Sequence, residues 1–267
     1  MPDTIADILR NPVKEKLARG EVVASMTVRL VSNIEIASIA KTAGFDTLYI
    51  DVEHSSFSLA TTGQICIAAL AVGIAPFVRV PSIRPEHVGR ALDGGALGVI
   101  APHIRSAEEA RAVVRAAKFP PLGERSAAGG LPHLRYRSFP QAEATRALDD
   151  ATTVMVQCES AEFLDRADEI LGVEGVDMAM IGTNDLLADW GLTGQYEHPR
   201  VREAYAHVIA AAKRHGKHVG VGGLATRPQL AADFVRMGAR YVSTGTDLAF
   251  LLAACTEKAT QVREMIV

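Results

Sequence analysis

The stretch TLYIDVEH, residues 47–54, decides the fold because a short apolar run ends there in acidic and basic side chains. The stretches PFVRVP (76–81), TVMVQCE (153–159) and DMAMIGTND (177–185) repeat this pattern. A charged side chain buried in a strand is strongly unfavourable, so such residues must emerge where the strand ends. If the strands are parallel, their carboxyl ends meet on one rim. The residues expected at that rim are Asp51, Glu53, His54, Arg79, Gln157, Glu159, Asn184 and Asp185.

Strand-like and helix-like segments alternate along the chain. Strands without polar alternation are typical of parallel sheets covered on both faces, and eight strand–helix units favour a closed (β/α)8 barrel. We therefore expect a single α/β domain over residues 1–267, a TIM barrel preceded by an amphipathic helix at 5–19. The expected strands are 22–28, 47–54, 76–81, 97–104, 153–159, 177–185, 218–225 and 241–247. The expected helices are 35–42, 59–72, one opened by Pro85, 107–117, 163–171, 201–215, 229–237 and 248–265.

The composition excludes several classes of protein. The net charge is −3 with acidic and basic residues mixed, so no basic surface for nucleic acid or an anionic membrane is expected. The three cysteines lie far apart, which argues against a disulfide framework and a zinc cluster. The amino-terminal stretch carries alternating charges, so neither a signal peptide nor a membrane anchor is predicted. We expect a cytoplasmic protein whose partners are small molecules and copies of itself.

The connection between residues 119 and 151 is long and rich in Gly, Pro, Arg and Ser. Connections longer than about a dozen residues are uncommon unless they are functional or disordered. Because this one comes after the strand that ends near His103, we expect it to fold over the rim and to supply Arg125 and Ser126. A surface excursion without ligand contacts is the alternative.

Glu159 and Asp185 end the fifth and sixth expected strands, which are neighbours in a barrel. Their carboxylates can therefore reach a shared point. Hard oxygen ligands, completed by water and a substrate oxygen, suit an octahedral Mg²⁺, Mn²⁺ or Co²⁺ site, and we expect a divalent cation there. The alternative is that each carboxylate pairs with an arginine in a structural salt bridge.

His54 ends the second expected strand, three residues after Asp51. The usual pKa of histidine, about 6.5, suits proton transfer near neutral pH, and the adjacent Asp51 and Glu53 favour a catalytic His54. A histidine that caps a helix or fills a packing gap is the alternative. Asp93, in ALDGGA, could hydrogen-bond the imidazole either within the chain or across a subunit boundary.

Arg79 lies between two valines, where an arginine is unfavourable unless it meets an anion. Its planar guanidinium suits a carboxylate or an enolate oxygen. A buried ion pair to Asp51 or Glu159 is the competing interpretation, and both interactions can coexist. The turn at 182–184 exposes backbone N–H groups that could hold a ligand carboxylate.

The sequence lacks the signatures of other chemistries. No lysine ends an expected strand at the rim, so a Schiff-base mechanism is not predicted. Carbonyl activation then falls to the cation. The glycine motifs of nucleotide and dinucleotide binding are also absent.

At these residues the chain resembles the HpcH/HpaI family of metal-dependent (class II) pyruvate aldolases. The ordered motifs run through nearly the whole chain: GFDTLYIDVEH, PFVRVP, ALDGGALGVIAPHI, KFPPLGERS, the Q-x-E of 157–159, GVDMAMIGTNDL and GARYVSTGTDL. The resemblance implies a homohexamer, a trimer of dimers in which the last helix is exchanged between neighbouring subunits. It also implies a divalent metal on Glu159 and Asp185, with the enolate of pyruvate as nucleophile.

The resemblance also implies roles for single residues. His54 matches the general base, Arg79 the group that stabilises the enolate, and Asp93 the carboxylate that tunes the histidine. The substrate contacts are matched by Gln157, Thr183, Asn184 and Asp185. Many members have G-P-[AS]-D where this chain has GTND, and Arg-Gly where it has Arg125-Ser126. A tryptophan common after the first strand is also absent, and these departures bear on which aldehyde fits.

We predict a carbon–carbon lyase that reversibly cleaves a 4-hydroxy-2-oxo acid to pyruvate, or hydroxypyruvate, and an aldehyde through an enolate held at the metal. Two alternatives are open. One is a lyase of the same scaffold that acts on a CoA thioester or decarboxylates oxaloacetate. The other is a non-catalytic barrel that binds an oxo acid.

Overall fold

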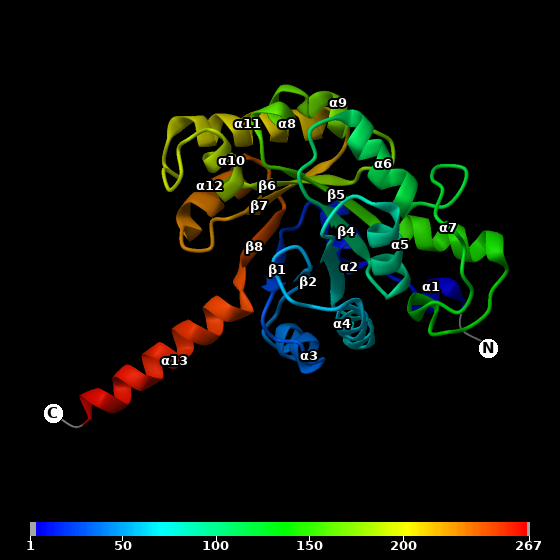
Figure 1. Cartoon of the computed structure of the whole chain (residues 1–267), viewed down its shortest axis with the longest axis horizontal. Helices are drawn as coiled ribbons and strands as arrows, with labels where there is room; N and C mark the ends of the chain where they lie inside the picture. The colour runs from blue at the N-terminus through cyan, green and yellow to red at the C-terminus, as the bar shows by residue number, and fades with distance from the viewer. Residues whose placement is uncertain (1–3, 266–267) are drawn as a thin grey trace.

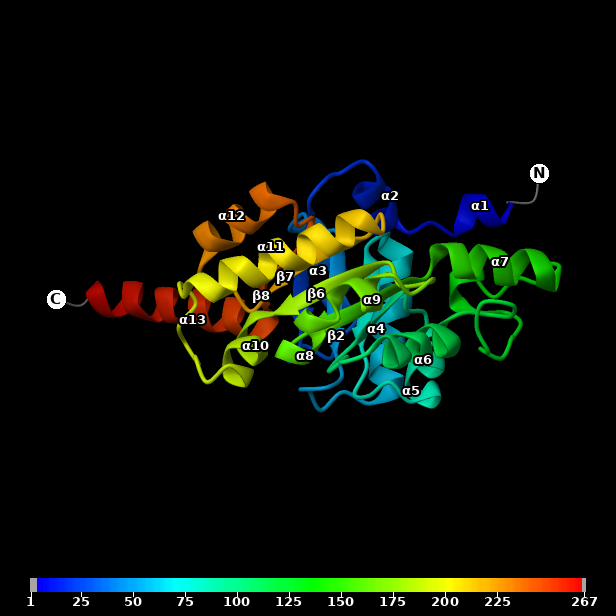
Figure 2. The same cartoon turned by 90° about the horizontal axis from the view of Figure 1, so that it is seen from above.

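The computed structural model describes residues 4–265, which form a closed barrel of eight parallel strands in sequence order. Each strand pairs with the next, and β8 pairs with β1. Figure 1 and Figure 2 show the helices arranged around the strands. The predicted (β/α)8 fold is confirmed. The strands are β1 Val23–Val28, β2 Thr47–Asp51, β3 Ala75–Arg79, β4 Gly98–Ala101, β5 Thr153–Cys158, β6 Met178–Gly182, β7 His218–Gly222 and β8 Tyr241–Thr246.

Most of the helices start at a residue suited to that position. Ser58, Ser106 and Ser160 each accept a hydrogen bond from a backbone N–H of the first turn, which defines where the helix begins. The helices are α1 Ile5–Ile8, α2 Pro12–Ala18, α3 Glu35–Thr42, α4 Leu59–Val72, α5 Pro85–Asp93, α6 Ala107–Ala117, α7 Gln141–Ala151, α8 Ala161–Asp165, α9 Ala167–Leu171, α10 Thr183–Asp189, α11 Pro199–Arg214, α12 Pro228–Met237 and α13 Asp247–Glu264, with a short 3-10 helix η1 at Pro132–Leu134.

The register of β2 and β3 brings two charged residues to the rim together. The pairing runs from Thr47 opposite Ala75 to Asp51 opposite Arg79. Every residue of both strands is buried, as expected for parallel strands covered on both faces. Because the charged pair stands at the last position of each strand, it meets at the open end of the barrel.

The helix expected at 5–19 is in fact two helices, α1 and α2. Asn11 has extended backbone, and its side-chain oxygen accepts hydrogen bonds from two backbone N–H groups of the first turn of α2. Pro12 follows at the first helical position, where its missing N–H removes no hydrogen bond, whereas it could not continue a helix from α1. The side-chain amide of Asn11 also donates to the carbonyl O of Ala151 at 2.7 Å, and this bond holds α2 near the start of β5.

The long connection after α6 lies at the amino ends of the strands. Lys118 Nζ donates to the carbonyl O of Thr152, just before β5, at 2.8 Å, and Phe119 is buried among apolar side chains that include the amino-terminal segment. The expectation that this connection folds over the rim of its own chain is wrong. The connection follows a helix, and the helix returns the chain to the amino ends of the strands, opposite the face that carries barrel active sites. Its last third is also the helix α7 rather than a loop.

The interior of the barrel is filled below the rim. Tyr241 and Phe77 are fully buried and stack with ring centroids 6.2 Å apart. The Tyr241 hydroxyl is hydrogen-bonded to Ser25 Oγ at 2.8 Å. A packed interior is the rule for eight-stranded barrels, so a ligand must bind above these rings at the carboxyl ends of the strands.

Helix α13 extends away from the barrel, as both views show (Figure 1, Figure 2). Every residue from 248 to 265 is exposed in the single chain. Large apolar side chains are among them: Leu248, Phe250, Leu251, Leu252, Val262 and Met265. Across residues 4–265, none of the helices has the length and apolarity needed to cross a bilayer.

Candidate active site

A cavity of about 480 Å³ opens at the carboxyl ends of the strands. The structure brings together there all but one of the polar residues expected at the rim. The exception, Glu53, does not line the cavity and forms an ion pair with Arg79. The rim residues that line the cavity are Asp51, His54, Arg79, Gln157, Glu159, Asn184 and Asp185.

Asp51 and Arg79 form a bidentate ion pair at the base of the cavity. Arg79 Nε donates to Asp51 Oδ1 at 3.0 Å and Nη2 to Oδ2 at 2.6 Å. The third nitrogen, Nη1, lies 2.9 Å from Glu53 Oε2. The ion pair that was the competing interpretation of Arg79 is therefore present. Arg79 also lines the cavity. The ion pair therefore fixes the orientation of a guanidinium group that a ligand in the cavity could contact.

Asp51 also positions the segment that carries His54. Its Oδ1 accepts hydrogen bonds from the backbone N–H groups of Glu53 and His54, both at 3.1 Å. The His54 imidazole is about half exposed, and its Nε2 lies 3.7 Å from Glu53 Oε2. The ring thus stands at the edge of the cavity, open to a ligand, rather than filling a gap in the core.

Glu159 is a buried carboxylate held by a histidine. Its Oε2 accepts the backbone N–H of His103 at 3.1 Å and lies 3.3 Å from the His103 Nδ1. Burial raises the pKa of the Glu159 carboxyl, and Asp185 raises it further, against the hydrogen bond from His103. In the described part of the chain, neither Glu159 nor Asp185 pairs with an arginine.

The residues fit a divalent cation, provided that other ligands complete its coordination. Between residues 4 and 265, no three His, Cys, Asp or Glu side chains form a group that could hold a metal by themselves. The carboxylates of Glu159 and Asp185 are nevertheless close enough that Asp185 raises the pKa of Glu159. Together they form a site that attracts positive charge. The Oε1 atom of Gln157 is buried without a hydrogen-bond partner, so the site also offers an uncharged group to a ligand.

Thr183, Asn184 and Asp185 form the first turn of α10 rather than a strand end. Thr183 is buried, and its Oγ1 is hydrogen-bonded to Tyr205 Oη at 2.9 Å and to the carbonyl O of Gly222 at 2.7 Å. Its side chain therefore joins α10 to β7 and α11. The two residues after it line the cavity, with backbone N–H groups of a helix start that are not used within the helix.

Asp93, Arg125 and Ser126 lie elsewhere in the chain, around a second cavity of about 520 Å³. Arg125 Nη2 is 2.7 Å from Asp93 Oδ1, and the Arg125 side chain is only 3% exposed. None of the three lines the rim cavity. Within one chain, Asp93 therefore pairs with Arg125 and not with His54.

Sequence reasoning assigned no role to two residues that shape the site. His103 has a positive φ of 57°, and its Nε2 lies 2.7 Å from Glu53 Oε1, so the imidazole links Glu53 to Glu159. Arg29 lines the cavity and lies 3.5 Å from Asp51. Both residues come just after a strand end, and that position is the signal that could have identified them.

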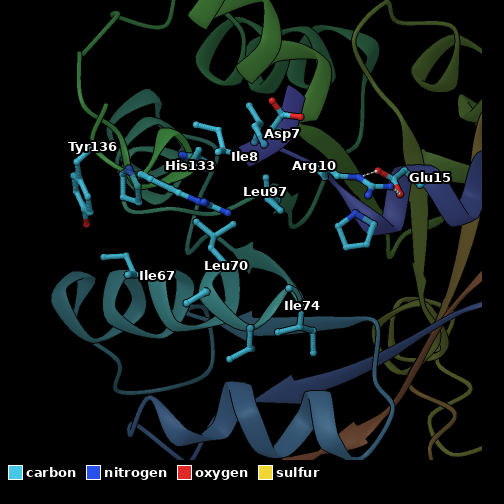
Figure 3. Close-up of a pocket in the computed structure, with 17 residues that line it drawn as sticks. Asp7, Ile8, Arg10, Glu15, Ile67, Leu70, Ile74, Leu97, His133 and Tyr136 are labelled. Atoms are coloured by element: carbon cyan, nitrogen blue, oxygen red, sulfur yellow. Dashed lines mark hydrogen bonds and ion pairs between the residues drawn. The ribbon is translucent and has the colours of Figure 1, made fainter. Parts of the chain in front are cut away.

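A larger cavity, of about 870 Å³, lies between the amino-terminal segment and α4, and is also lined by residues of η1 and just after it (Figure 3). Its lining is largely apolar, with Ile67, Leu70 and Ile74 along one side, and Arg10 and Glu15 form an ion pair with each other at its edge. Catalysis requires acidic, basic and cationic groups that converge. That requirement favours the smaller rim cavity as the active site.

The chain is similar to known proteins over most of its length. The model of the family described as HpcH/HpaI aldolase/citrate lyase matches residues 26–254. The chain is 43% identical over 216 residues to a 4-hydroxy-4-methyl-2-oxoglutarate aldolase of Hapsidospora irregularis, a match that covers 80% of each protein. It is 33% identical over 249 residues to a 4-hydroxy-2-oxo-heptane-1,7-dioate aldolase of Klebsiella pneumoniae, covering 91% of this chain and 90% of that protein.

A solved structure extends the match to the fold. The crystal structure of an HpcH/HpaI aldolase from Desulfitobacterium hafniense aligns with a TM-score of 0.88 at 34% identity, covering 94% of this chain and 96% of that one. The residues that match the family model, 26–254, include every residue that lines the rim cavity. The chain belongs to the HpcH/HpaI aldolase/citrate lyase family.

Proposed function

We propose that the protein is an aldolase that reversibly cleaves a 4-hydroxy-2-oxo acid to pyruvate, or hydroxypyruvate, and an aldehyde. The observation that carries the proposal is the convergence of the Asp51–Arg79 pair, His54 and the carboxylates of Glu159 and Asp185 around one cavity. The names of the two relatives support it, because both describe aldolases of 4-hydroxy-2-oxo acids.

Glu159 and Asp185 are the proposed ligands of a divalent cation, Mg²⁺, Mn²⁺ or Co²⁺. Such a cation, when bound, supplies Lewis-acid polarisation of the keto group of the substrate. Water and the substrate would complete its coordination. The buried, unpartnered Oε1 of Gln157 and the first turn of α10 are the proposed contacts to the 2-oxo acid.

In the proposed mechanism, His54, Arg79 and Asp51 carry out the other steps of the cleavage. His54 accepts the proton of the 4-hydroxyl, the C3–C4 bond breaks, and its electron pair forms the enolate of pyruvate while C4 becomes the aldehyde carbon. Arg79 stabilises the negative oxygen of that enolate, because a positioned cation acts most strongly where charge develops. Asp51 keeps Arg79 in position through two hydrogen bonds. Water gives a proton to C3 of the enolate, and His54 returns its proton to the hydroxide that this leaves, so pyruvate is released and the neutral histidine is restored.

We also propose a homohexamer, a trimer of dimers, in which α13 is exchanged between subunits. The exposed apolar side chains of α13 support this, because a single chain leaves them uncovered. Asp93, Arg125 and Ser126 would then contribute to the site of a neighbouring subunit. The Asp93 carboxylate, 43% exposed beside Arg125, is available for such a contact. The free cysteines suit a reducing cytoplasm.

The size of the cavity favours a small acid over a CoA thioester. Ligand pockets commonly span roughly 300–1,000 Å³, and the rim cavity of about 480 Å³ lies in the lower part of that range. Cleavage of a small 4-hydroxy-2-oxo acid is therefore the better match to this site.

The test is release of pyruvate from a panel of 4-hydroxy-2-oxo acids, with and without EDTA. We expect release that EDTA abolishes and that added Mg²⁺ or Mn²⁺ restores. Oxaloacetate serves in the same panel as a substrate for decarboxylation. If no member of the panel releases pyruvate in a metal-dependent reaction, the aldolase proposal fails.

Two variants separate cation binding from proton transfer. Glu159→Ala should lose both Mn²⁺ binding and turnover, whereas His54→Ala should bind Mn²⁺ normally and lose about 10²- to 10⁴-fold in rate. The matched control is Glu162→Ala, which removes an exposed acid on α8 that lies 3.4 Å from Arg105. That control should bind Mn²⁺ as the unaltered protein does.

A further inference from the structure

Arg29 is a cation at the edge of the rim cavity, next to the carboxyl end of β1. Its side chain is 40% exposed. Nη2 donates to the backbone carbonyl O of His54 at 2.9 Å, and Nε lies 3.5 Å from Asp51 Oδ2. The guanidinium is therefore fixed beside the proposed proton acceptor without being buried.

Much of the hydrogen-bonding capacity of Arg29 is unused. A guanidinium has five N–H donors, and among residues 4–265 only the His54 carbonyl accepts a hydrogen bond from this one. Asp51 already receives two hydrogen bonds from Arg79, so its attraction for Arg29 is the weaker, longer contact. The spare donors of Arg29 are available to a ligand, and their geometry suits a carboxylate.

Asp247 holds the backbone of Arg29 in place. This residue is 3% exposed, and its carboxylate accepts the backbone N–H groups of Arg29, Leu30 and Val31 at 3.0, 2.9 and 2.7 Å. Hydrogen bonds to an ionised carboxylate are stronger than those between neutral groups. The loop therefore presents the guanidinium from a fixed backbone, which reduces the entropy lost when a ligand binds.

The position of Arg29 indicates which part of a substrate it meets. The proposed contacts to the 2-oxo acid group come from β5 and the start of α10. Arg29 comes from β1 and touches the segment after β2, where His54 is placed to act on the 4-hydroxyl. A substrate that spans these groups has the portion beyond C4 next to Arg29.

We propose that Arg29 is a specificity-determining residue that binds a second carboxylate on the aldehyde half of the substrate. The preferred substrates are then dicarboxylic 4-hydroxy-2-oxo acids, which release an aldehyde that itself carries a carboxylate. This inference rests on the proposed aldolase function.

A second arginine near the rim provides the matched control. The Arg227 guanidinium lies 3.9 Å from the centroid of the Tyr196 ring and its Nη1 donates to Thr226 Oγ1 at 3.1 Å. Both partners line the cavity, whereas Arg227 itself does not. Substitution of Arg227 removes a similar charge near the site without removing the group proposed to contact the second carboxylate.

The turnover test compares two substrates that differ in one group. 4-Hydroxy-2-oxoglutarate yields glyoxylate, and 4-hydroxy-2-oxopentanoate yields acetaldehyde. From the free energy of a hydrogen bond to a charged group, we expect the unaltered protein to have a kcat/KM about 10- to 100-fold higher for the diacid than for the monoacid. Arg29→Met should reduce this ratio to near one and Arg29→Lys should restore part of it, while Arg227→Met should leave the ratio unchanged. An unaltered protein that does not prefer the diacid, or a ratio that persists in Arg29→Met, overturns the inference.

A binding measurement distinguishes failure of the inference from failure of the proposed function. 2-Oxoglutarate and 2-oxopentanoate lack the 4-hydroxyl and cannot be cleaved, so their affinities in the presence of Mn²⁺ are measured by calorimetry. We expect tighter binding of 2-oxoglutarate, lost in Arg29→Met. Cleavage of both hydroxy acids at equal rates, with equal affinities for the two analogues, would leave the aldolase standing and reject the role of Arg29. Preferential binding of 2-oxoglutarate without any cleavage would retain Arg29 and reject the aldolase.

Discussion

Gly182 leaves the space that the Glu159 carboxylate occupies. A Cβ atom at position 182 would lie 2.8 Å from both Cγ and Oε1 of Glu159, closer than a Cβ atom approaches atoms to which it is not bonded. The absence of a side chain at the end of β6 is thus a condition for the position of the proposed metal ligand.

Gly182→Ala should therefore displace the Glu159 carboxylate and weaken Mn²⁺ binding by about 10- to 100-fold, as changes around metal ligands commonly do. Mn²⁺ affinity measured by calorimetry checks this. Gly129→Ala is the control, because an added Cβ there meets no atom within 4 Å. Unchanged Mn²⁺ affinity in Gly182→Ala would show that Glu159 is not a ligand or that it moves freely.

His133 links pH to stability at a site far from the rim. Burial lowers the pKa of its imidazole to about 4, and its Nε2 is 2.9 Å from the carbonyl O of Ala96. The unfolded chain, with the usual pKa of about 6.5, binds more protons than the folded chain between these two values. Stability from the neutral histidine is therefore complete above about pH 6.5 and is lost as the pH falls toward 4.

From this shift we expect His133 to account for the loss of about 2 kcal/mol of unfolding free energy between pH 7.5 and pH 5. Urea unfolding at the two pH values, compared with His133→Gln, isolates the contribution, since glutamine can donate a hydrogen bond but does not titrate. Equal pH dependence in the two proteins would contradict the prediction.

At the scale of elements, Asp247 joins the start of α13 to the loop after β1. Its Oδ1 accepts the backbone N–H of Leu248 at 2.9 Å as well as that of Arg29. Four backbone N–H groups depend on this one buried carboxylate, so it holds the loop against the start of α13, which Thr246 caps.

Asp247→Asn should destabilise the protein by about 2 kcal/mol, because an amide NH₂ replaces an acceptor that faces backbone N–H groups. The unfolding midpoint in urea measures the change, and the preference for dicarboxylic substrates should fall with it. Glu257→Gln, in the exposed part of α13, serves as control and should unfold like the unaltered protein. A midpoint for Asp247→Asn equal to that of the control would reject this role.

At the scale of the whole molecule, α13 is the feature that a single chain does not explain. Soluble monomers rarely expose contiguous apolar patches of this kind, and Leu251 and Leu252 are 52% and 63% exposed. An 18-residue helix with so little support of its own is expected to be stabilised by packing against another surface.

The double variant Leu251→Asp/Leu252→Asp should therefore shift the mass measured by light scattering from a multiple of 28.5 kDa toward the single chain. Charged side chains in an apolar interface lose their hydration, which favours dissociation. Lys258→Glu, which changes a charge on the same helix, should keep the mass of the unaltered protein. An unaltered protein that is already a 28.5 kDa monomer would contradict both the prediction and the hexamer.

Sequence patterns were sufficient to predict the barrel, the family, the aldolase function and the group of residues at the rim. The reason is physical: strands covered on both faces must be apolar along their length, so residues such as Asp51 and Arg79 are tolerated only at strand ends. Parallel strands then bring those ends to one face. The local sequence also contains signals for the break before Pro12 and for the helix α7. Neither feature was predicted, because local propensity is weaker evidence than the alternation of strands and helices.

Other features depend on contacts between residues far apart in the chain, which no local pattern encodes. Asp247 bonds the backbone of Arg29 across 218 positions, and Arg125 pairs with Asp93 across 32. The side of the barrel on which the long connection lies follows from the path of the closed fold. Spacing and periodicity in the sequence determine which residues reach the rim. The tertiary structure determines which of them form hydrogen bonds or ion pairs with one another, because a hydrogen bond forms only when donor and acceptor lie within a few ångströms.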